Sequence, residues 1–195
     1  MQRKKLTGYI AGAILFILLL WGFTTYNSLV KKEEKVKLKW SEVQNTYQRR
    51  LDLVPSLVNV VKGVSDFEQT VLIKITEARS RAISGLSNNE LTAANYQNQK
   101  ILQDTLASAA NRLIILIENY PELKGTSAYS GLQTQLEGTE RRIIVARKDF
   151  NEAVAKYNQK VRSFPVNIIA GLFGFKKKEG FEAGAGTEKG VDIKF

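Results

Sequence analysis

Residues 6–30 read LTGYIAGAILFILLLWGFTTYNSLV and carry no charged side chain, while Lys5 precedes the stretch and Lys31 follows it. An α-helix needs about 20 mainly apolar residues to cross the roughly 30 Å hydrocarbon core of a bilayer. Residues 9–23 are the most apolar part, and the milder residues on either side bring the stretch to that length. We therefore expect residues 1–30 to form a membrane anchor that tethers the rest of the chain to a bilayer.

A cleaved signal peptide is the alternative interpretation, because residues 3–5 form a basic segment before an apolar core. Signal peptidases need small side chains near the cleavage site, and the large ones found here favour an uncleaved anchor. Trp21, Phe23 and Tyr26 are aromatic side chains of the kind that collect at the membrane–water boundary. We expect these three residues to lie at the membrane interface.

Gly8 and Gly12 form a G-x-x-x-G pattern, a spacing that lets two membrane helices approach closely. Self-association through this pair is one interpretation. The other is that these glycines have no special role, since Gly is frequent in membrane helices.

Basic residues near the two ends of the span predict its orientation, because Lys and Arg favour the cytoplasmic side. Three of them lie in residues 3–5 and five lie in residues 31–39. The larger number follows the span, so we expect the domain after it to be cytoplasmic.

The 195-residue chain contains no Cys and no His, and its formal net charge is +10. Disulfides, thiolate chemistry, and zinc sites or acid–base catalysis built on these two residue types are excluded. Much of the positive charge lies in residues 3–5, 31–39 and 176–178, outside the expected core. This placement favours a lipid bilayer over nucleic acid as a partner, and we expect no nucleic acid to bind.

Apolar residues after the anchor recur with alternating spacings of four and three, which is typical of helices that pack along a coiled-coil-like seam. The two clearest series are Leu53, Leu57, Val60, Val64, Phe67 and Val71, and then Leu132, Leu136, Thr139, Ile143, Ala146, Phe150, Ala153, Tyr157 and finally Val161 or Phe164. No strand pattern competes with them. The sequence predicts an all-α fold, with an N-terminal transmembrane helix followed by an antiparallel up-and-down bundle of long helices over residues 31–164.

Asp52 and Pro55 decide how many helices we expect in the bundle. Proline lacks an amide hydrogen and disfavours helical angles in the residue before it, and Asp52 can cap a new helix. A turn at this point gives four helices, which we favour, and a kink gives three. Further helices are expected over about residues 90–120 and 127–163, the first with an apolar stripe of Leu91, Ala94, Ile101, Leu102, Leu106, Ala109, Leu113, Leu116 and Tyr120.

Residues 165–178 read PVNIIAGLFGFKKK and are too short to span a bilayer. They match an interfacial segment whose apolar side chains sink below the head groups while lysines meet anionic lipid. The expected membrane-interface residues are Phe173, Phe175, Lys176, Lys177 and Lys178. The alternative is that this segment folds back over the open end of the bundle. Residues 179–195 are rich in Gly, Ala and charge, and we expect a mobile tail.

Carboxylates on facing helices can bind metal ions inside a bundle, so Glu68, Glu118, Glu140 and Arg147 are the residues to weigh for chemistry. Dinuclear iron bundles also use Glu-x-x-His, which this chain lacks, and ion pairs near the seam explain these residues more simply. Paired arginines can hold phosphate but are ordinary on exposed helix faces: Arg49, Arg50, Arg141 and Arg142. We expect no catalytic residue, no metal site and no cofactor.

Several short sequences in a fixed order resemble the bacterial LemA family from end to end. They include W-S-x-V-Q at residues 40–44, RRLDLVPSLV at 49–58, E-N-Y-P-x-L at 118–123 and T-E-x-R-I-x-x-A-R at 139–147. Each piece alone is weak, whereas the ordered set is specific. Residues 150–151 depart from the family, which usually has Tyr-Asn where this chain has Phe-Asn; the change costs only a hydroxyl.

The resemblance implies a single-pass protein of the bacterial cell (inner) membrane, with a helical-bundle domain and no known enzymatic activity. Some relatives in magnetotactic bacteria take part in forming the magnetosome membrane. We therefore hypothesise a non-catalytic adaptor, scaffold or membrane organiser that binds a protein partner whose identity the sequence does not reveal. The alternative hypothesis is a carboxylate-based metal-binding or enzymatic bundle.

Overall fold

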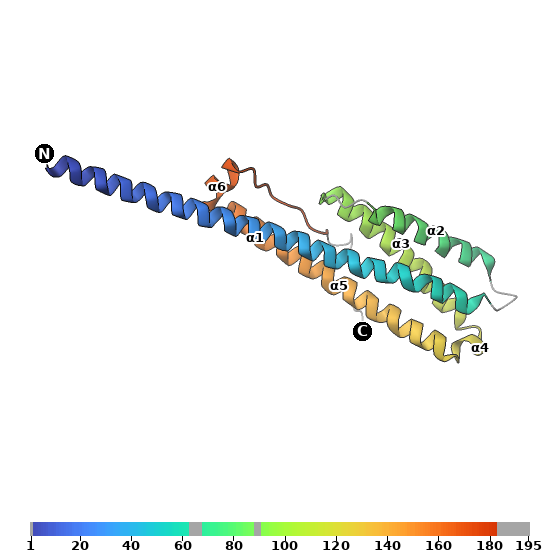
Figure 1. The fold of residues 1–195 in the computed structure, drawn as a ribbon. Coiled ribbons are helices and arrows are strands. Elements are labelled where there is room, and N and C mark those ends of the chain that lie inside the picture. The colour runs from blue at the N-terminus through green and yellow to red at the C-terminus, as the bar shows by residue number, and fades with distance from the viewer. Residues whose placement is uncertain (1, 63–67, 88–90, 183–195) are drawn as a thin grey trace, which may run out of the picture. The chain divides into compact units, whose positions relative to one another are not determined.

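The computed structural model describes residues 2–62, 68–87 and 91–182, and the fold of this part is all-α, which confirms the prediction (Figure 1). The helices are α1 (Gln2–Val61), α2 (Gln69–Leu86), α3 (Ala93–Ile117), α4 (Pro121–Lys124), α5 (Ser127–Arg162) and α6 (Val166–Leu172). The chain divides into two compact units. The first unit contains residues up to 39 together with 152–178, and the second contains 40–151 together with the residues from 179 onward.

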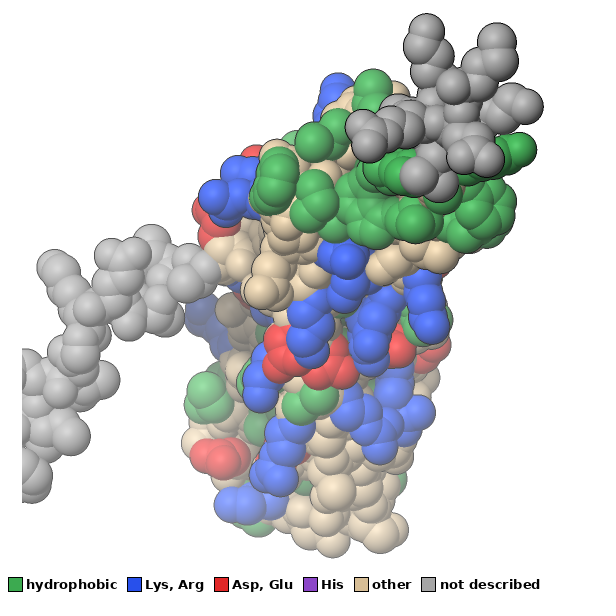
Figure 2. Space-filling view, turned by 90° about the vertical axis from the view of Figure 1, so that its left-hand side faces the viewer, with side chains coloured by type: hydrophobic (Ala, Val, Ile, Leu, Met, Phe, Trp, Pro, Cys, Tyr) green, Lys and Arg blue, Asp and Glu red, His purple; other side chains and the backbone are tan. Residues whose placement is uncertain are grey.

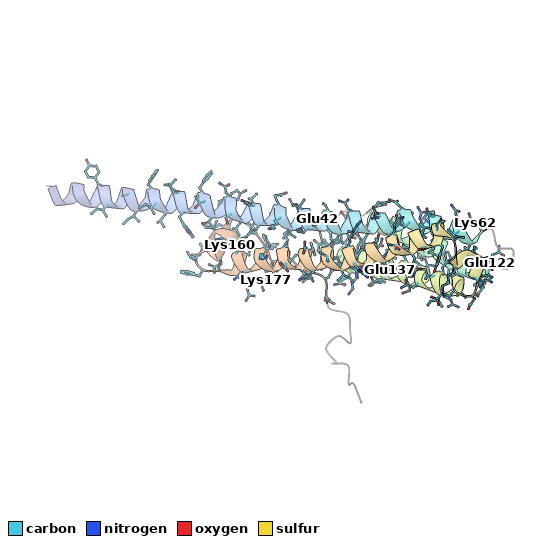
Figure 3. The ribbon with its side chains drawn as sticks, turned by 90° about the horizontal axis from the view of Figure 1, so that it is seen from below. Glu42, Lys62, Glu122, Glu137, Lys160 and Lys177 are labelled. Carbon is cyan, nitrogen blue, oxygen red and sulfur yellow. The ribbon has the colours of Figure 1, made fainter. Side chains whose placement is uncertain are left out.

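The anchor lies in the first unit as the N-terminal part of α1. This is the one helix in the described ranges that is long and apolar enough to cross a membrane. Its large side chains project from the helix with little around them (Figure 3), and Leu19 and Phe23 are 65% and 67% exposed. A run of such side chains is costly in water and favourable in lipid.

The second unit is a bundle whose core collects side chains from α1, α2, α3 and α5. The α2 and α3 helices lie side by side and run in opposite directions (Figure 1). The largest cluster of buried apolar residues comprises Leu51, Val54, Leu57, Val61, Val71, Ile75, Ala78, Ala82, Leu106, Ala110, Leu113, Ile117, Tyr129 and Leu136. These four helices agree with the favoured helix count.

The predicted seam of α5 is confirmed over most of its length. Leu136, Thr139, Ile143, Ala146, Phe150, Ala153, Tyr157 and Val161 are all buried, and only Leu132 is half-buried. The helix begins at Ser127, as predicted. The Thr126 side chain accepts a hydrogen bond from the Tyr129 amide at 3.2 Å, which caps this end.

The predicted stripe of α3 is wrong in the N-terminal half of the helix. Ile101 is 62% exposed, whereas Asn95, Gln99 and Gln103 are buried. These polar residues recur every fourth position on the inward face, where Gln99 Nε2 donates to Asn95 Oδ1 at 3.4 Å. A search for apolar periodicity cannot find such a face, since its residues count as polar although they are buried inside the protein. Leu106 and Leu113 restore the predicted stripe further along.

The predicted turn at Asp52 and Pro55 is also wrong, because α1 continues through Pro55 to Val61. Pro55 cannot donate the hydrogen bond that the carbonyl oxygen of Leu51 would normally accept four residues earlier. That oxygen instead accepts a hydrogen bond from Arg79 Nε of α2 at 2.9 Å. A partner from another helix thus satisfies the group that the proline leaves unpaired.

The chain instead leaves the first bundle helix between Val61 and the start of α2 at Gln69. Val64 and Phe67, which we expected on the seam of one continuous helix, lie outside the described residues. The favoured count of four bundle helices is therefore right, although the turn was placed about ten residues too early in the sequence.

We expect Arg79→Ala to destabilise the bundle by about 1.5–3 kcal/mol, since it leaves the Leu51 carbonyl buried without its charged donor. In a Pro55→Ala background the amide of residue 55 can bond that carbonyl, so the same change should cost much less. Urea unfolding of the four proteins of this double-mutant cycle measures the coupling. Equal costs in both backgrounds would show that Arg79 does not compensate for the proline.

Candidate functional site

The C-terminal segment packs against the anchor helix within the first unit. Val166 and Ala170 of α6 are buried, and Ile169 Cδ1 lies at van der Waals distance, 3.8 Å, from the position that a Cβ at Gly22 would take. The rings of Phe173 and Phe175 lie 4.9 and 5.6 Å from the ring of Tyr26, measured between centroids. Three of the predicted membrane-interface residues therefore form one aromatic cluster, Tyr26, Phe173 and Phe175.

The same segment also exposes large apolar side chains. Ile168, Leu172 and Phe173 are 54%, 75% and 60% exposed, and Phe164 just before α6 is 81% exposed. Soluble proteins rarely present such a patch unless it binds something. We call these four residues the α6 apolar face. Because Ile169 lies against Gly22 and Phe173 against Tyr26, this face lies beside the end of the apolar stretch, where Trp21 and exposed Phe23 also lie.

The three predicted lipid-facing lysines differ in their surroundings. Lys176 and Lys177 are exposed, as an interfacial role requires. Lys178 is mostly buried instead, with its ammonium 2.9 Å from Glu33 Oε1 and 5.5 Å from the centre of the Tyr157 ring. Figure 2 shows hydrophobic side chains gathered in one patch with Lys and Arg side chains next to it.

Asn158 fixes the main chain at Lys178. Its Nδ2 donates to the Lys178 carbonyl oxygen at 2.7 Å, and its Oδ1 accepts from the Lys178 amide at 2.9 Å. Burial, with a smaller contribution from Glu33, raises the pKa of the nearby Tyr157 to about 12. The segment after α6 is therefore held by specific contacts within the first unit.

The second unit contains a buried arginine that the sequence did not reveal. Arg50 is 1% exposed, and its Nε and Nη2 donate to the two carboxylate oxygens of Glu140 at 2.8 and 2.5 Å. Its Nη1 donates to the carbonyl oxygen and Oε1 of Gln103 at 2.8 and 3.1 Å. Paired Arg residues at 49 and 50 predicted an ordinary exposed face, and for Arg50 this is wrong. The arrangement joins α1, α3 and α5 and leaves the guanidinium no room to act on a substrate.

A second arginine, Arg147, lies between Tyr47 and Asp104. It donates to Tyr47 Oη at 2.9 Å and to Asp104 Oδ1 at 2.8 Å, and its Cζ lies 5.3 Å from the centre of the Tyr47 ring. Burial raises the pKa of Tyr47, and the charge of Arg147 partly opposes this effect. The predicted interpretation of Arg147 as a member of an ion pair is confirmed.

The carboxylates weighed for a metal site are not brought together. Glu140 is bound to Arg50, Glu68 precedes α2, and Glu118 follows α3. Among the described residues, no group of three or more acidic side chains could hold a metal ion.

Arg141 and Arg142, the other arginine pair, line a surface pocket of about 350 Å³. Glu42 and Asp149 line the same pocket, and their carboxylates oppose the binding of an anion.

Phe181 is the residue that sequence reasoning missed most clearly. The tail was predicted to be mobile from residue 179, but Phe181 is only 9% exposed. It joins an aromatic cluster with Trp40, Tyr96 and Phe150, at centroid distances of 5.9, 6.2 and 5.5 Å. The one available signal was an aromatic residue in a segment rich in Gly, Ala and charged residues.

Because of Tyr96 in this cluster, the stability of the fold varies with pH in the alkaline range. Burial raises its pKa to about 12, against about 10 in an unfolded chain. Below pH 10 both states keep the proton. Between pH 10 and 12 only the unfolded state loses it, so the tyrosine lowers stability by about 1.4 kcal/mol per pH unit.

We expect Tyr96→Phe to leave stability almost unchanged at pH 7, since the buried hydroxyl has no hydrogen-bond partner in the described part of the chain. Above pH 10 the variant should lose stability less steeply than the parent. Urea unfolding at pH 7, 10.5 and 11.5 checks both statements. Parallel losses in the two proteins would mean that Tyr96 ionises as readily in the fold as outside it.

A family model, that of the LemA family, matches residues 39–195. Magnetosome protein MamQ 2 of Paramagnetospirillum magneticum is 26% identical over 175 residues, covering 80% of this chain and 64% of that protein. Magnetosome protein MamQ of Magnetospirillum gryphiswaldense is 26% identical over 174 residues, with the same two shares. Protein LemA of Metamycoplasma hominis is 26% identical over 163 residues, covering 80% of this chain and 71% of that protein. The chain thus spans 64% of the length of these MamQ relatives.

Proposed function

Since the chain belongs to the LemA family, we propose that it is a non-catalytic, membrane-anchored helical bundle that acts as an adaptor or membrane organiser. The apolar N-terminal helix and the relatives support a membrane location. Three related proteins bear names that assign them to magnetosomes, which is consistent with an organising role at a membrane.

The observation that carries the proposal is the α6 apolar face. Phe164, Ile168, Leu172 and Phe173 remain exposed although the same segment packs against Gly22 and Tyr26 of the anchor helix. In this proposal the face enters the lipid interface beside the span, and exposed Lys176 and Lys177 meet anionic head groups. The anchor then has two points of contact with the bilayer instead of one, which restricts how the chain can tilt.

The charged groups of the second unit support a structural role over a catalytic one. Arg50 and Arg147, which are wholly or largely buried there, are bound to Glu140 and Asp104. A catalytic group must reach a substrate, and these side chains are committed to holding helices together.

Crosslinking in native membranes, followed by mass spectrometry, tests the adaptor role. A photoreactive residue at Ile144, an apolar position on α5 that is 67% exposed, should capture one defined protein reproducibly. A buried position such as Ile143 is the matched control. Capture of lipid alone would contradict the adaptor role. Stoichiometric iron or manganese in the purified protein would favour a metal-binding bundle instead.

We also propose that the membrane is the bacterial inner membrane and that the bundle lies on its cytoplasmic side, from the five lysines in residues 31–39. The native chain has no Cys, so a single Arg49→Cys variant reports the side directly. A membrane-impermeant maleimide added to intact spheroplasts should leave it unlabelled until the membrane is opened. Immediate labelling would reverse the orientation.

A further inference from the structure

Phe181 is held in the second unit by contacts that resemble those of a bound ligand. Trp40, Tyr96 and Phe150 surround its ring, and the guanidinium carbon of Arg147 lies 5.6 Å from the ring centre. The segment that carries Phe181 has neither helix nor strand from residue 175 to residue 182. A single anchoring side chain thus inserts into a pocket formed by helices far away in sequence.

Asn151 binds the main chain at the same point. Its Oδ1 accepts from the Phe181 amide at 2.8 Å, and its Nδ2 donates to the Phe181 carbonyl oxygen at 3.1 Å. These two bonds would form with any residue at this position, while the aromatic pocket selects the side chain. Backbone hydrogen bonds for affinity and a side-chain pocket for specificity are the usual means of recognising an extended peptide.

The residues on either side of Phe181 add two further requirements. A Cβ at Gly180 would lie 2.5 Å from Asn151 Oδ1, and Asn151 cannot move away without losing its two bonds to Phe181. On the other side, Lys100 Nζ donates to the Glu182 carbonyl oxygen at 3.0 Å. The site therefore requires a glycine before the aromatic residue, and Lys100, beside residue 182, favours an acidic residue there.

The chain's own segment does not satisfy the site fully. Trp40 Nε1 and Tyr96 Oη are buried, and neither has a hydrogen-bond partner in the described part of the chain. Phe181 offers no polar atom to them, and the same segment from a second copy would offer none either. A foreign segment whose aromatic residue carries a hydroxyl brings a polar group into this pocket, and a hydrogen bond to either atom would favour it over the chain's own phenylalanine.

We propose that this pocket is a docking site for an extended segment of a partner protein, with a Gly–Tyr pair followed by an acidic residue, and that Gly180 and Phe181 occupy it as an internal competitor. The proposal rests on the adaptor function proposed above and names its partner-binding surface. A partner must displace the internal segment, whose effective concentration is of the order of millimolar. A segment that cannot compete with the internal segment at this effective concentration therefore does not bind.

The test uses the full chain in nanodiscs with Trp21→Phe, which leaves Trp40 as the single tryptophan. Gly180→Val should release the internal segment, and the peptide EGYEAG should then bind at least tenfold more tightly than to the parent, as read from Trp40 fluorescence. Asn151→Ala in the Gly180→Val protein should weaken binding at least tenfold. EGFEAG should bind about fivefold more weakly than EGYEAG, the value of roughly one hydrogen bond, and EGAEAG should not bind.

Circular dichroism establishes that each variant is folded, and Phe181→Ala replaces Gly180→Val if the latter melts early. If EGYEAG does not bind a folded variant whose internal segment is released, the proposed docking site does not exist. The adaptor function is still tested separately by crosslinking. If EGFEAG binds as tightly as EGYEAG, a tyrosine gives a foreign segment no advantage over the chain's own phenylalanine, and this part of the proposal is overturned.

A second copy of the chain is tested as the occupant by mixing two single-cysteine proteins, Lys100→Cys and Glu182→Cys, with a short bis-maleimide. Crosslinks should form within one chain that carries both cysteines, and not between the two mixed proteins. A crosslinked dimer in the mixture would make a second copy the occupant and overturn the assignment to a partner.

Discussion

Leu57→Asp is expected to unfold the bundle of the second unit almost completely. Leu57 is fully buried in the apolar cluster that α1 shares with α2 and α3. The substitution removes a buried leucine, worth about 2–5 kcal/mol when replaced by alanine, and places a carboxylate among the apolar side chains of this cluster, which is costly. Their sum approaches the whole stability of an ordinary domain, about 5–15 kcal/mol.

Urea unfolding of the Trp21→Phe protein, followed by Trp40 fluorescence, measures this loss. The matched control is Ser56→Asp, which introduces the same carboxylate one residue earlier at an exposed position. It should change stability by less than about 0.5 kcal/mol. Native-like unfolding of Leu57→Asp would mean that the inward face of α1 is misassigned.

Arg50→Met is expected to cost about 3 kcal/mol. The change leaves the carboxylate of Glu140 and the polar groups of Gln103 without the guanidinium that binds them. Breaking a buried ion pair by removing one partner typically costs about 3–5 kcal/mol. The Glu140 side chain is 39% exposed, so water can solvate it in part, which places the expected cost at the lower end.

Arg49→Met provides the matched control, since Arg49 has the same charge and is exposed. We expect it to change stability by less than about 0.5 kcal/mol. The double variant Arg50→Met, Glu140→Leu should regain part of the loss, because no unpaired charge remains. Equal effects of Arg49→Met and Arg50→Met would show that the buried network contributes nothing to stability.

The features that could be predicted are those that apolar periodicity encodes. Ile143, Phe150 and Tyr157 lie seven residues apart, and all three are buried in α5 as expected. The anchor was equally clear, because a long uncharged stretch has few structural interpretations. Each of these predictions used residues near one another in sequence.

The features that could not be predicted depend on partners far away in sequence. Arg50 is buried because Glu140, ninety residues later, binds it, and α1 passes Pro55 because Arg79 satisfies the carbonyl of Leu51. Phe181 is buried because Asn151 binds its main chain and three aromatic rings pack against its side chain. Local composition alone gave the opposite prediction at all three places.

Measuring the depth of the α6 apolar face in the bilayer tests the proposed second membrane contact most directly. A nitroxide on Leu172→Cys, in a chain without native Cys, should be relaxed more by oxygen than by a water-soluble nickel complex in anionic proteoliposomes. A nitroxide on Ile144→Cys, also at an exposed apolar helical position, should show the opposite preference. If the label at residue 172 is as accessible to the nickel complex as the label at residue 144, the α6 apolar face lies in water and the proposed second contact does not exist.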